Sequence, residues 1–429
     1  MNDSSDGFRH AHPATLQGQL QRGRGLGAQR APHTPGAAEL VYSCVLTDSR
    51  WDRQTEYRDS YLTRLIHRMD LHLGPIEDHL LGHRGSDAEE IELSLQVLAL
   101  LPFLGRGDAV PVLRRYAASG IHWVAAIEAI KWTGSLKLAD VWDGLEQDVV
   151  AGHDDAALAA ELDNSEPWVS WARTQPRIRR LLEERAASRP VPPVRACRAA
   201  TDHASSSTAE LLKRVAAGPG PERRHALEEL GRRGDPIVLD LAEDPSLRNA
   251  AAWTPGLPQT LHHLRTTAVP RARTWIGHQD DTLDRLAHRI LSEFGEHEDA
   301  PHLLNALTTA TEEGNWCAAE APARGLGRLH ITAAAEPLKH LWEATEHSTA
   351  RQAILAGLSG CAPETAALCA MEGLNDCEPA VQRAAPALLA NTPAARTRLI
   401  QLRDDPLAYE VREAAQAALD RPLESGDEQ

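Results

Sequence analysis

The side chains best suited to binding gather in residues 51–58, which read Trp-Asp-Arg-Gln-Thr-Glu-Tyr-Arg. Two aromatic rings, two arginines and two acids in so short a stretch are typical of protein recognition sites. We therefore predict a binding spot that comprises Trp51, Asp52, Arg53, Glu56 and Arg58. The alternative is structural: a turn begins a capping hairpin, and Arg53 pairs with Glu56 three positions further along a helix surface.

A second candidate site is a basic segment between residues 171 and 198, which holds eight arginines and two glutamates in an otherwise acidic chain. Arginine binds phosphate and carboxylate groups through paired hydrogen bonds, and two neighbouring tryptophans add flat surfaces. The binding residues predicted here are Trp168, Trp171, Arg177, Arg179 and Arg180. The alternative is an intramolecular role, in which the basic segment lies against the acidic remainder of the molecule.

One trio has the spacing of metal ligands. His340, Glu343 and His347 lie three and four positions apart, so a helix would place them on one face. No fourth ligand follows, and we interpret the trio as part of a polar face in a chain with 20 histidines. The sequence contains no P-loop, nucleophile elbow or zinc-protease motif. We predict no metal, no cofactor and no catalytic residue.

Three cysteines, Cys361, Cys369 and Cys377, are evenly spaced, but a turn separates them. We expect them to be buried as small residues at helix contacts. The six cysteines of the chain include no pair with CxxC spacing, the N-terminus has no hydrophobic signal core, and no apolar run is long enough to cross a membrane. These features predict a cytoplasmic protein with reduced thiols and no membrane association.

Composition narrows the fold and the partners. The chain has 429 residues, of which 42% are hydrophobic but only 4% are aromatic. Apolar residues do not alternate as they would in strands, and alanine and leucine supply most of the apolar surface, which favours closely packed helices. The net charge is −16, so the surface as a whole repels nucleic acid. We predict an all-α protein whose partner is another protein; nucleic acid is the disfavoured alternative.

The most regular element is expected over residues 280–307. Six apolar residues recur there at steps of three and four, from Leu283 to Phe294, which predicts one amphipathic helix. Asp280 or Asp281 caps its start, and Gly295 is expected to end it in a left-handed conformation. Asp299 and Pro301 then begin a second helix, so the stretch forms a helix hairpin of about 32 residues.

The same hairpin recurs along the chain. Expected turn residues stand at Gly295, Gly327, Gly360 and Asn391, with steps of 32, 33 and 31 residues. Each follows one apolar helical stripe and precedes another. A less regular series of turn glycines stands at positions 74, 105 and 134. We predict a stack of antiparallel helix hairpins in both halves of the chain.

Changes in composition divide the chain into five parts. Residues 1–36 are polar and glycine-rich, so we expect a disordered tail. Residues 37–164 form an N-terminal helical-hairpin region, and residues 165–207 form the Trp- and Arg-rich segment followed by a linker. Residues 208–420 form the C-terminal repeat array, and residues 421–429 form a polar tail.

The helix openings of the repeats resemble those of HEAT repeats of the kind found in phycobilisome-lyase proteins. Asp405-Pro406 is followed by Val411 and Arg412, and Asp376 is followed by Val381 and Arg383. The likeness is good over about 222–420 and weaker over 37–160. It implies an α-solenoid, in which the aspartate and the arginine stabilise the turns between repeats.

The resemblance leaves three functions open. The first is a scaffold or adaptor that grips another protein on a concave face, without enzymatic activity. The second is a DNA-binding or DNA-repair protein similar to the alkylpurine DNA glycosylases of this architecture. The third is a lyase-like or chaperone subunit that acts on a modified protein. A similarity to HEAT-repeat deoxyhypusine hydroxylases is rejected, because their di-iron site needs several His-Glu pairs and this chain has only His297-Glu298.

Overall fold

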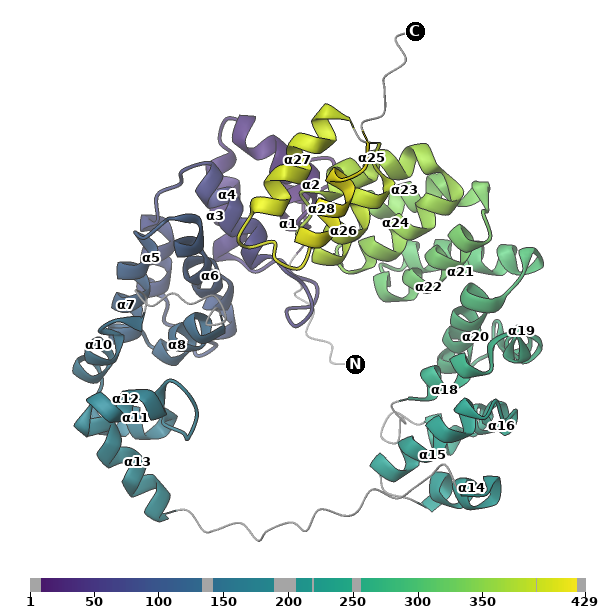
Figure 1. Ribbon diagram of the computed structural model, residues 1–429, viewed down its shortest axis with the longest axis horizontal. Coiled ribbons are helices and arrows are strands. Elements are labelled where there is room, and N and C mark those ends of the chain that lie inside the picture. Colours follow the sequence, from purple (N-terminus) through teal and green to yellow (C-terminus); the bar gives the residue numbers. More distant parts are fainter. Residues whose placement is uncertain are drawn as a thin grey trace. The chain divides into compact units, whose positions relative to one another are not determined.

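The computed structural model describes residues 9–132, 142–188, 206–217, 220–248, 256–390 and 392–422. Helices and their connections account for all of these residues, and no strand occurs among them (Figure 1). The predicted all-α class is therefore confirmed for the described part of the chain. The chain divides into two compact units. Unit 1 comprises Met1–Val194, Glu346–Thr349 and Ala370–Gln429, and unit 2 comprises Arg195–Thr345 and Ala350–Cys369.

Unit 1 contains the helices of both ends of the chain. Its N-terminal helices are α1 (Leu16–Gln21), α2 (Gly25–Arg30), η1 (Ala31–His33), α3 (Ala37–Leu46), α4 (Asp59–Arg68), α5 (Gly74–Gly82), α6 (Glu89–Leu100), η2 (Leu101–Leu104), α7 (Ala109–Ser119), α8 (Trp123–Trp132), α10 (Leu145–Gly152), α11 (Asp155–Glu161), α12 (Trp168–Thr174) and α13 (Pro176–Ser188). Its C-terminal helices are α26 (Pro379–Ala384), η7 (Ala385–Leu388), α27 (Pro393–Asp404) and α28 (Arg412–Leu419).

Unit 2 contains the middle of the chain. Its helices are α14 (Thr208–Ala217), α15 (Gly220–Arg232), α16 (Ile237–Glu243), α17 (Pro245–Arg248), α18 (Leu257–His263), η4 (Arg265–Ala268), α19 (Val269–Trp275), α20 (Asp281–Phe294), η5 (His297–Asp299), α21 (Ala300–Glu312), α22 (Trp316–Arg328), η6 (Thr332–Ala334), α23 (Ala335–Ala344) and α24 (Ala350–Cys361). Helix α25 (Pro363–Gly373) crosses the boundary, since residues 370–373 group with unit 1.

Helices of unit 1 pack in two alternating series. Helices α4, α6 and α8 contact one another in succession, and α3, α5, α7 and α10 do the same. The two series share one apolar core, to which Ile66, Leu98 and Ile127 contribute fully buried side chains. Helices α6 and α8 of the first series also line the candidate binding groove.

The amphipathic helix predicted from Leu283 to Phe294 is present as α20. Asp280 caps it, since its carboxylate accepts hydrogen bonds from the backbone N–H groups of Thr282 (2.9 Å) and Leu283 (3.4 Å). Five of the six apolar residues of its predicted stripe are buried, and the sixth, Phe294, is only partly buried. Gly295, however, has a φ of −69°, so the prediction of a left-handed residue is wrong. Glycine is required there, because a Cβ at position 295 would lie 2.8 Å from the carboxylate of Asp299. The same carboxylate caps the turn that follows.

The glycines taken as turn residues at 327 and 360 lie inside helices α22 and α24, which is a second correction. A Cβ on Gly327 would lie 2.6 Å from the Cα of Gly357, and a Cβ on Gly360 would overlap the carbonyl oxygen of Gly327. Gly327 and Gly360 therefore mark one contact, where α22 and α24 approach so closely that neither tolerates a side chain, whereas Gly295 follows the end of α20. The left-handed residue after α22 is His330, with a φ of 55°. Asn391 lies outside the described residues.

Residues 9–36 are ordered, which corrects the predicted disordered tail. Helices α1 and α2 bury Leu16 and Leu20, and two of the charged residues, Arg22 and Arg24, are also buried. The Arg24 guanidinium pairs with both carboxylate oxygens of Glu372 at 2.9 Å, so the N-terminal helices pack near the C-terminal helices of unit 1 (Figure 1). The sequence has too little apolar content for this segment to fold alone, but ion pairs and backbone hydrogen bonds hold it within unit 1.

The predicted division of the chain differs from the compact units at its C-terminal end. The C-terminal array was expected to run over 208–420, whereas residues 370–422 group with unit 1. The predicted N-terminal region, 37–164, falls within unit 1, and so do the described residues 165–188 of the Trp- and Arg-rich segment. Most of the predicted linker, residues 189–205, lies outside the described residues, as does the tail from 423 onwards.

Candidate binding groove

Residues 47–58 form an irregular loop, not the helix surface expected in the structural interpretation. Glu56 holds this loop in place. Its carboxylate accepts hydrogen bonds from the backbone N–H groups of Trp51 (3.0 Å) and Ser348 (2.7 Å) and lies 3.4 Å from the Arg58 guanidinium. Both charged side chains are almost fully buried, and Arg58 also donates to the sulfur of Cys377 at 2.6 Å. Glu56 and Arg58, both predicted as binding residues, are therefore buried and make their contacts inside the protein.

The outer part of the loop is held by a second set of charges. Arg50 forms hydrogen bonds with both carboxylate oxygens of Asp48, and Arg53 lies 3.3 Å from Asp48 and 2.7 Å from Glu89 on α6. The predicted Arg53–Glu56 pair is absent from these contacts. Asp52 accepts a hydrogen bond from the backbone N–H of Gln54 (2.8 Å), which tightens the turn. The loop is thus a fixed platform whose aromatic rings remain accessible.

Three aromatic rings face solvent around this platform. Trp51 is 50% exposed, Tyr57 is 40% exposed, and Trp132, the last residue of α8, is 56% exposed. They line an open groove of about 810 Å³. We call it the acidic groove, because its lining includes Asp52, Asp59, Glu89 and Glu92 but only two arginines, both of which pair with carboxylates. Exposed apolar groups that gather in one place and are rimmed by polar residues are typical of interaction sites.

Helix α6 supplies one wall of the acidic groove. Glu89, Glu92 and Gln96 lie at steps of three and four, so they share one face of the helix. The Gln96 amide donates to Glu92 at 2.8 Å, which fixes that carboxylate at the surface. The same three side chains and Trp132 also border a neighbouring hollow of about 550 Å³ along α6 and α8. The acidic face of α6 therefore continues beyond the loop.

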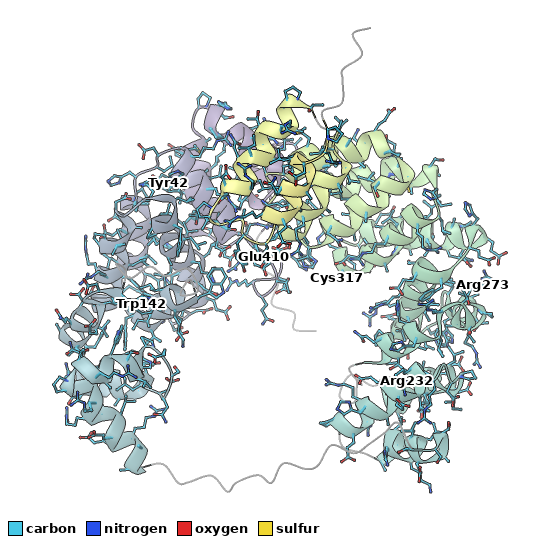
Figure 2. The ribbon with its side chains drawn as sticks, in the orientation of Figure 1. Tyr42, Trp142, Arg232, Arg273, Cys317 and Glu410 are labelled. Carbon is cyan, nitrogen blue, oxygen red and sulfur yellow. The ribbon has the colours of Figure 1, made fainter. Side chains whose placement is uncertain are left out.

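A smaller recess, of about 180 Å³, adjoins the acidic groove and shares Tyr57, Asp59 and Trp132 with it. We call it the ring pocket. Its other wall is the connection between α27 and α28, which contributes Tyr409 (62% exposed) and Glu410 (labelled in Figure 2). The Tyr409 hydroxyl donates to Glu410 at 3.0 Å. Burial and the nearby carboxylate of Glu410 raise the pKa of Tyr57, and the hydrogen bond to Glu410 raises the pKa of Tyr409.

The tryptophans of the predicted basic site are buried. Trp168 and Trp171 pack edge to face with ring centroids 5.2 Å apart, and Trp123 and Trp142 extend the cluster at 5.9 Å and 6.2 Å. Trp168 and Trp171 are 3% and 6% exposed. Both rings, predicted to belong to a binding surface, therefore lie in the core between α8, α12 and neighbouring segments.

The arginines of the same segment have partners within unit 1. Arg177 and Arg180 both pair with Asp155 at 2.5 Å, and Arg177 also donates to the carbonyl oxygen of Val150. Arg179 donates to two carbonyl oxygens at the end of α12, at 2.9 and 2.8 Å. The hydrogen bonds from Arg180 and Arg177 lower the pKa of Asp155. This arrangement matches the intramolecular interpretation for the described arginines; Arg189, Arg195 and Arg198 lie outside the described residues.

The structure shows where the His340, Glu343 and His347 trio and the three evenly spaced cysteines lie. Helix α23 ends at Ala344, so His347 does not share a helix face with His340 and Glu343. In the part of the chain that the structure describes, no group of three or more His, Cys, Asp or Glu side chains is arranged to hold a metal ion. Cys361, Cys369 and Cys377 are buried, as predicted.

Sequence reasoning missed the second half of the aromatic set. Tyr57 precedes α4 and is exposed, whereas Tyr61, within α4, is buried. Trp132 and Tyr409 were not singled out, because each stands alone in its own segment. The one signal in the sequence that could have indicated their exposure is a large ring at a helix end or in a connection, where a turn exposes side chains.

Comparison with protein-family models gives no match, and comparison with curated proteins gives none either. The site therefore has to be interpreted from its own geometry. Within the described residues, no helix combines the length and the apolar character needed to cross a bilayer.

Proposed function

We propose that this protein is an interaction scaffold or adaptor, and that the acidic groove of unit 1 binds a basic segment of another protein. The observation that carries the proposal is the exposure of Trp51, Tyr57 and Trp132 around a groove whose arginines are already paired with acids. Aromatic residues at the centre of an interface contribute much of its binding energy. Carboxylates around them attract a cationic partner and repel an anionic one.

We further propose that the helices form HEAT-like repeats. In unit 2, α20, α22 and α24 contact one another in succession, while α21 and α23 contact each other. This alternation supports a two-layer solenoid.

Two repeat openings in unit 1 behave as the resemblance implies. Asp376 and Asp405 accept hydrogen bonds from backbone N–H groups two residues further along, at 3.0 and 2.8 Å. Val381 and Val411 are buried behind these turns. The aspartates therefore close the turns, and the valines anchor the helices that follow. Helices α6 and α8 belong to the same series, so the acidic groove that they line lies on one helix layer of the proposed solenoid.

Nucleic acid is not favoured as the partner. Three of the arginines that kept this alternative open, Arg177, Arg179 and Arg180, pair with Asp155 or with backbone carbonyl groups, and the net charge of the chain is −16. A protein that makes several phosphate contacts shows steep salt dependence. We expect no binding of short single-stranded or duplex DNA at ~150 mM salt; tight, salt-sensitive binding would contradict the scaffold proposal.

A displayed library of random peptides tests the proposal directly. Selection on the wild-type protein is compared with selection on the double variant Glu89→Gln/Glu92→Gln and on Trp132→Ala. The matched control is Glu336→Gln/Glu364→Gln, which removes two exposed carboxylates from unit 2. We expect basic peptides to be enriched on the wild type and the control, and lost on the groove variants. Equal enrichment on all four proteins would overturn the assignment of the groove.

A further inference from the structure

The ring pocket differs from the acidic groove in size and lining. Pockets for whole small molecules occupy about 300–1,000 Å³. The ring pocket measures about 180 Å³, which suits the end of one side chain. It is bordered by three exposed rings, those of Tyr57, Trp132 and Tyr409, and these come from three separate segments of unit 1. No single stretch of sequence holds this arrangement.

The side chains that line the ring pocket favour a cation as its occupant. The faces of aromatic rings carry partial negative charge and attract organic cations within about 6 Å. Carboxylates of Asp59 and Glu410 border the same recess. Arg64 also lines it, but its guanidinium is paired with Asp405 at 2.5 Å, and Arg383 lies 3.4 Å from Glu410. Asp59 is buried and the Glu410 side chain is 35% exposed. The exposed faces of the three rings, with Glu410 beside them, therefore border a space suited to a flat, weakly hydrated cation.

We propose that the ring pocket receives a single arginine side chain of the basic segment that occupies the acidic groove. This inference rests on the proposed function, because it names the anchor residue of that partner. Arginine fits better than lysine, since its planar guanidinium stacks on aromatic faces and pairs with a carboxylate at the same time. The pocket adjoins the groove through Tyr57 and Trp132, so one extended segment reaches both.

Two labelled peptides of equal charge provide the test. Both alternate glycine and lysine, and they differ only in a central arginine or a central lysine. Fluorescence anisotropy at ~150 mM salt measures the affinity of each for the full-length protein. We expect the arginine peptide to bind the wild type about three- to tenfold more tightly, which is the range for ring–cation contacts. The double variant Tyr57→Ala/Tyr409→Ala should abolish this preference, and Tyr57→Phe/Tyr409→Phe should keep it.

The outcomes separate the two proposals. Failure of both peptides to bind the wild type would overturn the proposed function and the ring pocket with it. Binding that is lost in Glu89→Gln/Glu92→Gln, but shows the same affinity for both peptides, would leave the groove standing and overturn the ring pocket. Retention of the arginine preference in Tyr57→Ala/Tyr409→Ala would also overturn it. Circular dichroism of each variant checks that the helices are intact, and Leu368→Ala, which alters an exposed residue of unit 2, is the matched control.

Discussion

At the scale of single residues, Glu56 and Arg53 show how differently two nearby charges are used. The side chain of Glu56 is inaccessible and accepts hydrogen bonds from the backbone of Trp51 and Ser348. The side chain of Arg53 is 38% exposed and pairs with acids at the surface. Their spacing along the sequence suggested that Arg53 and Glu56 pair with each other. Instead, Glu56 is buried and stabilises the loop, whereas Arg53 lies at the surface.

The loss of Glu56 should therefore be costly. The substitution Glu56→Ala removes the carboxylate that pairs with the buried Arg58, and breaking a buried ion pair destabilises proteins by about 3–5 kcal/mol. We expect a loss of this size in urea unfolding of the full chain, followed by tryptophan fluorescence. Arg53→Ala serves as the control and should change the free energy of unfolding by about 1 kcal/mol or less. Similar effects of the two substitutions would contradict the structural role of Glu56.

His10 makes a prediction about pH. Burial and the guanidinium groups of Arg22 and Arg58 lower its pKa from 6.5 to about 4. The unfolded chain binds this proton at higher pH than the folded chain, so the histidine reduces stability as the pH falls from 6.5 towards 4. The nearby carboxylate of Glu346, 3.3 Å away, has a pKa raised by burial and acts in the opposite direction.

The variant His10→Asn isolates the histidine. Over this pH range, wild type should lose up to about 3 kcal/mol more stability than His10→Asn, since one pKa unit corresponds to about 1.4 kcal/mol. Urea midpoints measured at several pH values in both proteins give the difference. A constant difference between the two proteins from pH 6.5 to 4 would show that His10 is not held neutral.

At the scale of elements, the packing of α22 against α24 depends on the absence of side chains. Gly327 and Gly357 face each other so closely that a Cβ on the first would lie 2.6 Å from the Cα of the second. Gly360 meets the backbone of Gly327 in the same way. Backbone atoms cannot move aside as the end of a flexible side chain can, so the helices themselves must separate to admit a methyl group.

We therefore expect Gly360→Ala to destabilise unit 2 by about 1–3 kcal/mol, the usual cost of overpacking. An alanine would otherwise stabilise a helix by roughly 1 kcal/mol relative to glycine, so the sign of the change is diagnostic. Gly220→Ala is the matched control, because a Cβ there meets no atom within 4 Å. Thermal unfolding measured by circular dichroism compares the two. A Gly360→Ala protein as stable as wild type would contradict the close helix contact.

At the scale of the whole molecule, unit 1 is assembled from both ends of the chain. Arg24 pairs with Glu372, Arg64 pairs with Asp405, and the backbone N–H of Cys377 donates to the carbonyl oxygen of Gly23 at 2.9 Å. Unit 2, in contrast, is almost continuous in sequence. The two units should therefore respond differently to cutting the chain.

A fragment of residues 195–369 should retain its helices, whereas residues 1–194 alone should be digested rapidly at Arg22 and Arg24, which are buried in the full chain. Co-expression of residues 1–194 with residues 346–429, which include Glu346 beside Arg22, should restore protection of both arginines. Limited trypsin digestion and circular dichroism measure these outcomes. Resistance of the isolated 1–194 fragment equal to that of the whole chain would refute the dependence of unit 1 on its C-terminal helices.

The sequence by itself determined the helical class and the position of the best helices. The stripe of α20 and its Asp280 cap are local properties, because a helix places every third and fourth residue on one face whatever surrounds it. The burial of Cys361, Cys369 and Cys377 was expected from their small size. The period of about 32 residues was also visible, although Gly327 and Gly360 serve a helix contact and not turns.

Only the tertiary structure decided which charges are buried, which rings are exposed and where residues 9–36 lie. Tyr57, Trp132 and Tyr409 line one recess although they are distant in sequence, and the N-terminal helices are ordered through partners such as Glu372. These contacts join residues hundreds of positions apart, and no local pattern records them. The acidic groove is lined by residues between 50 and 132, whereas the ring pocket needs residues from both ends of the chain. The ring pocket is therefore a product of the tertiary packing of unit 1.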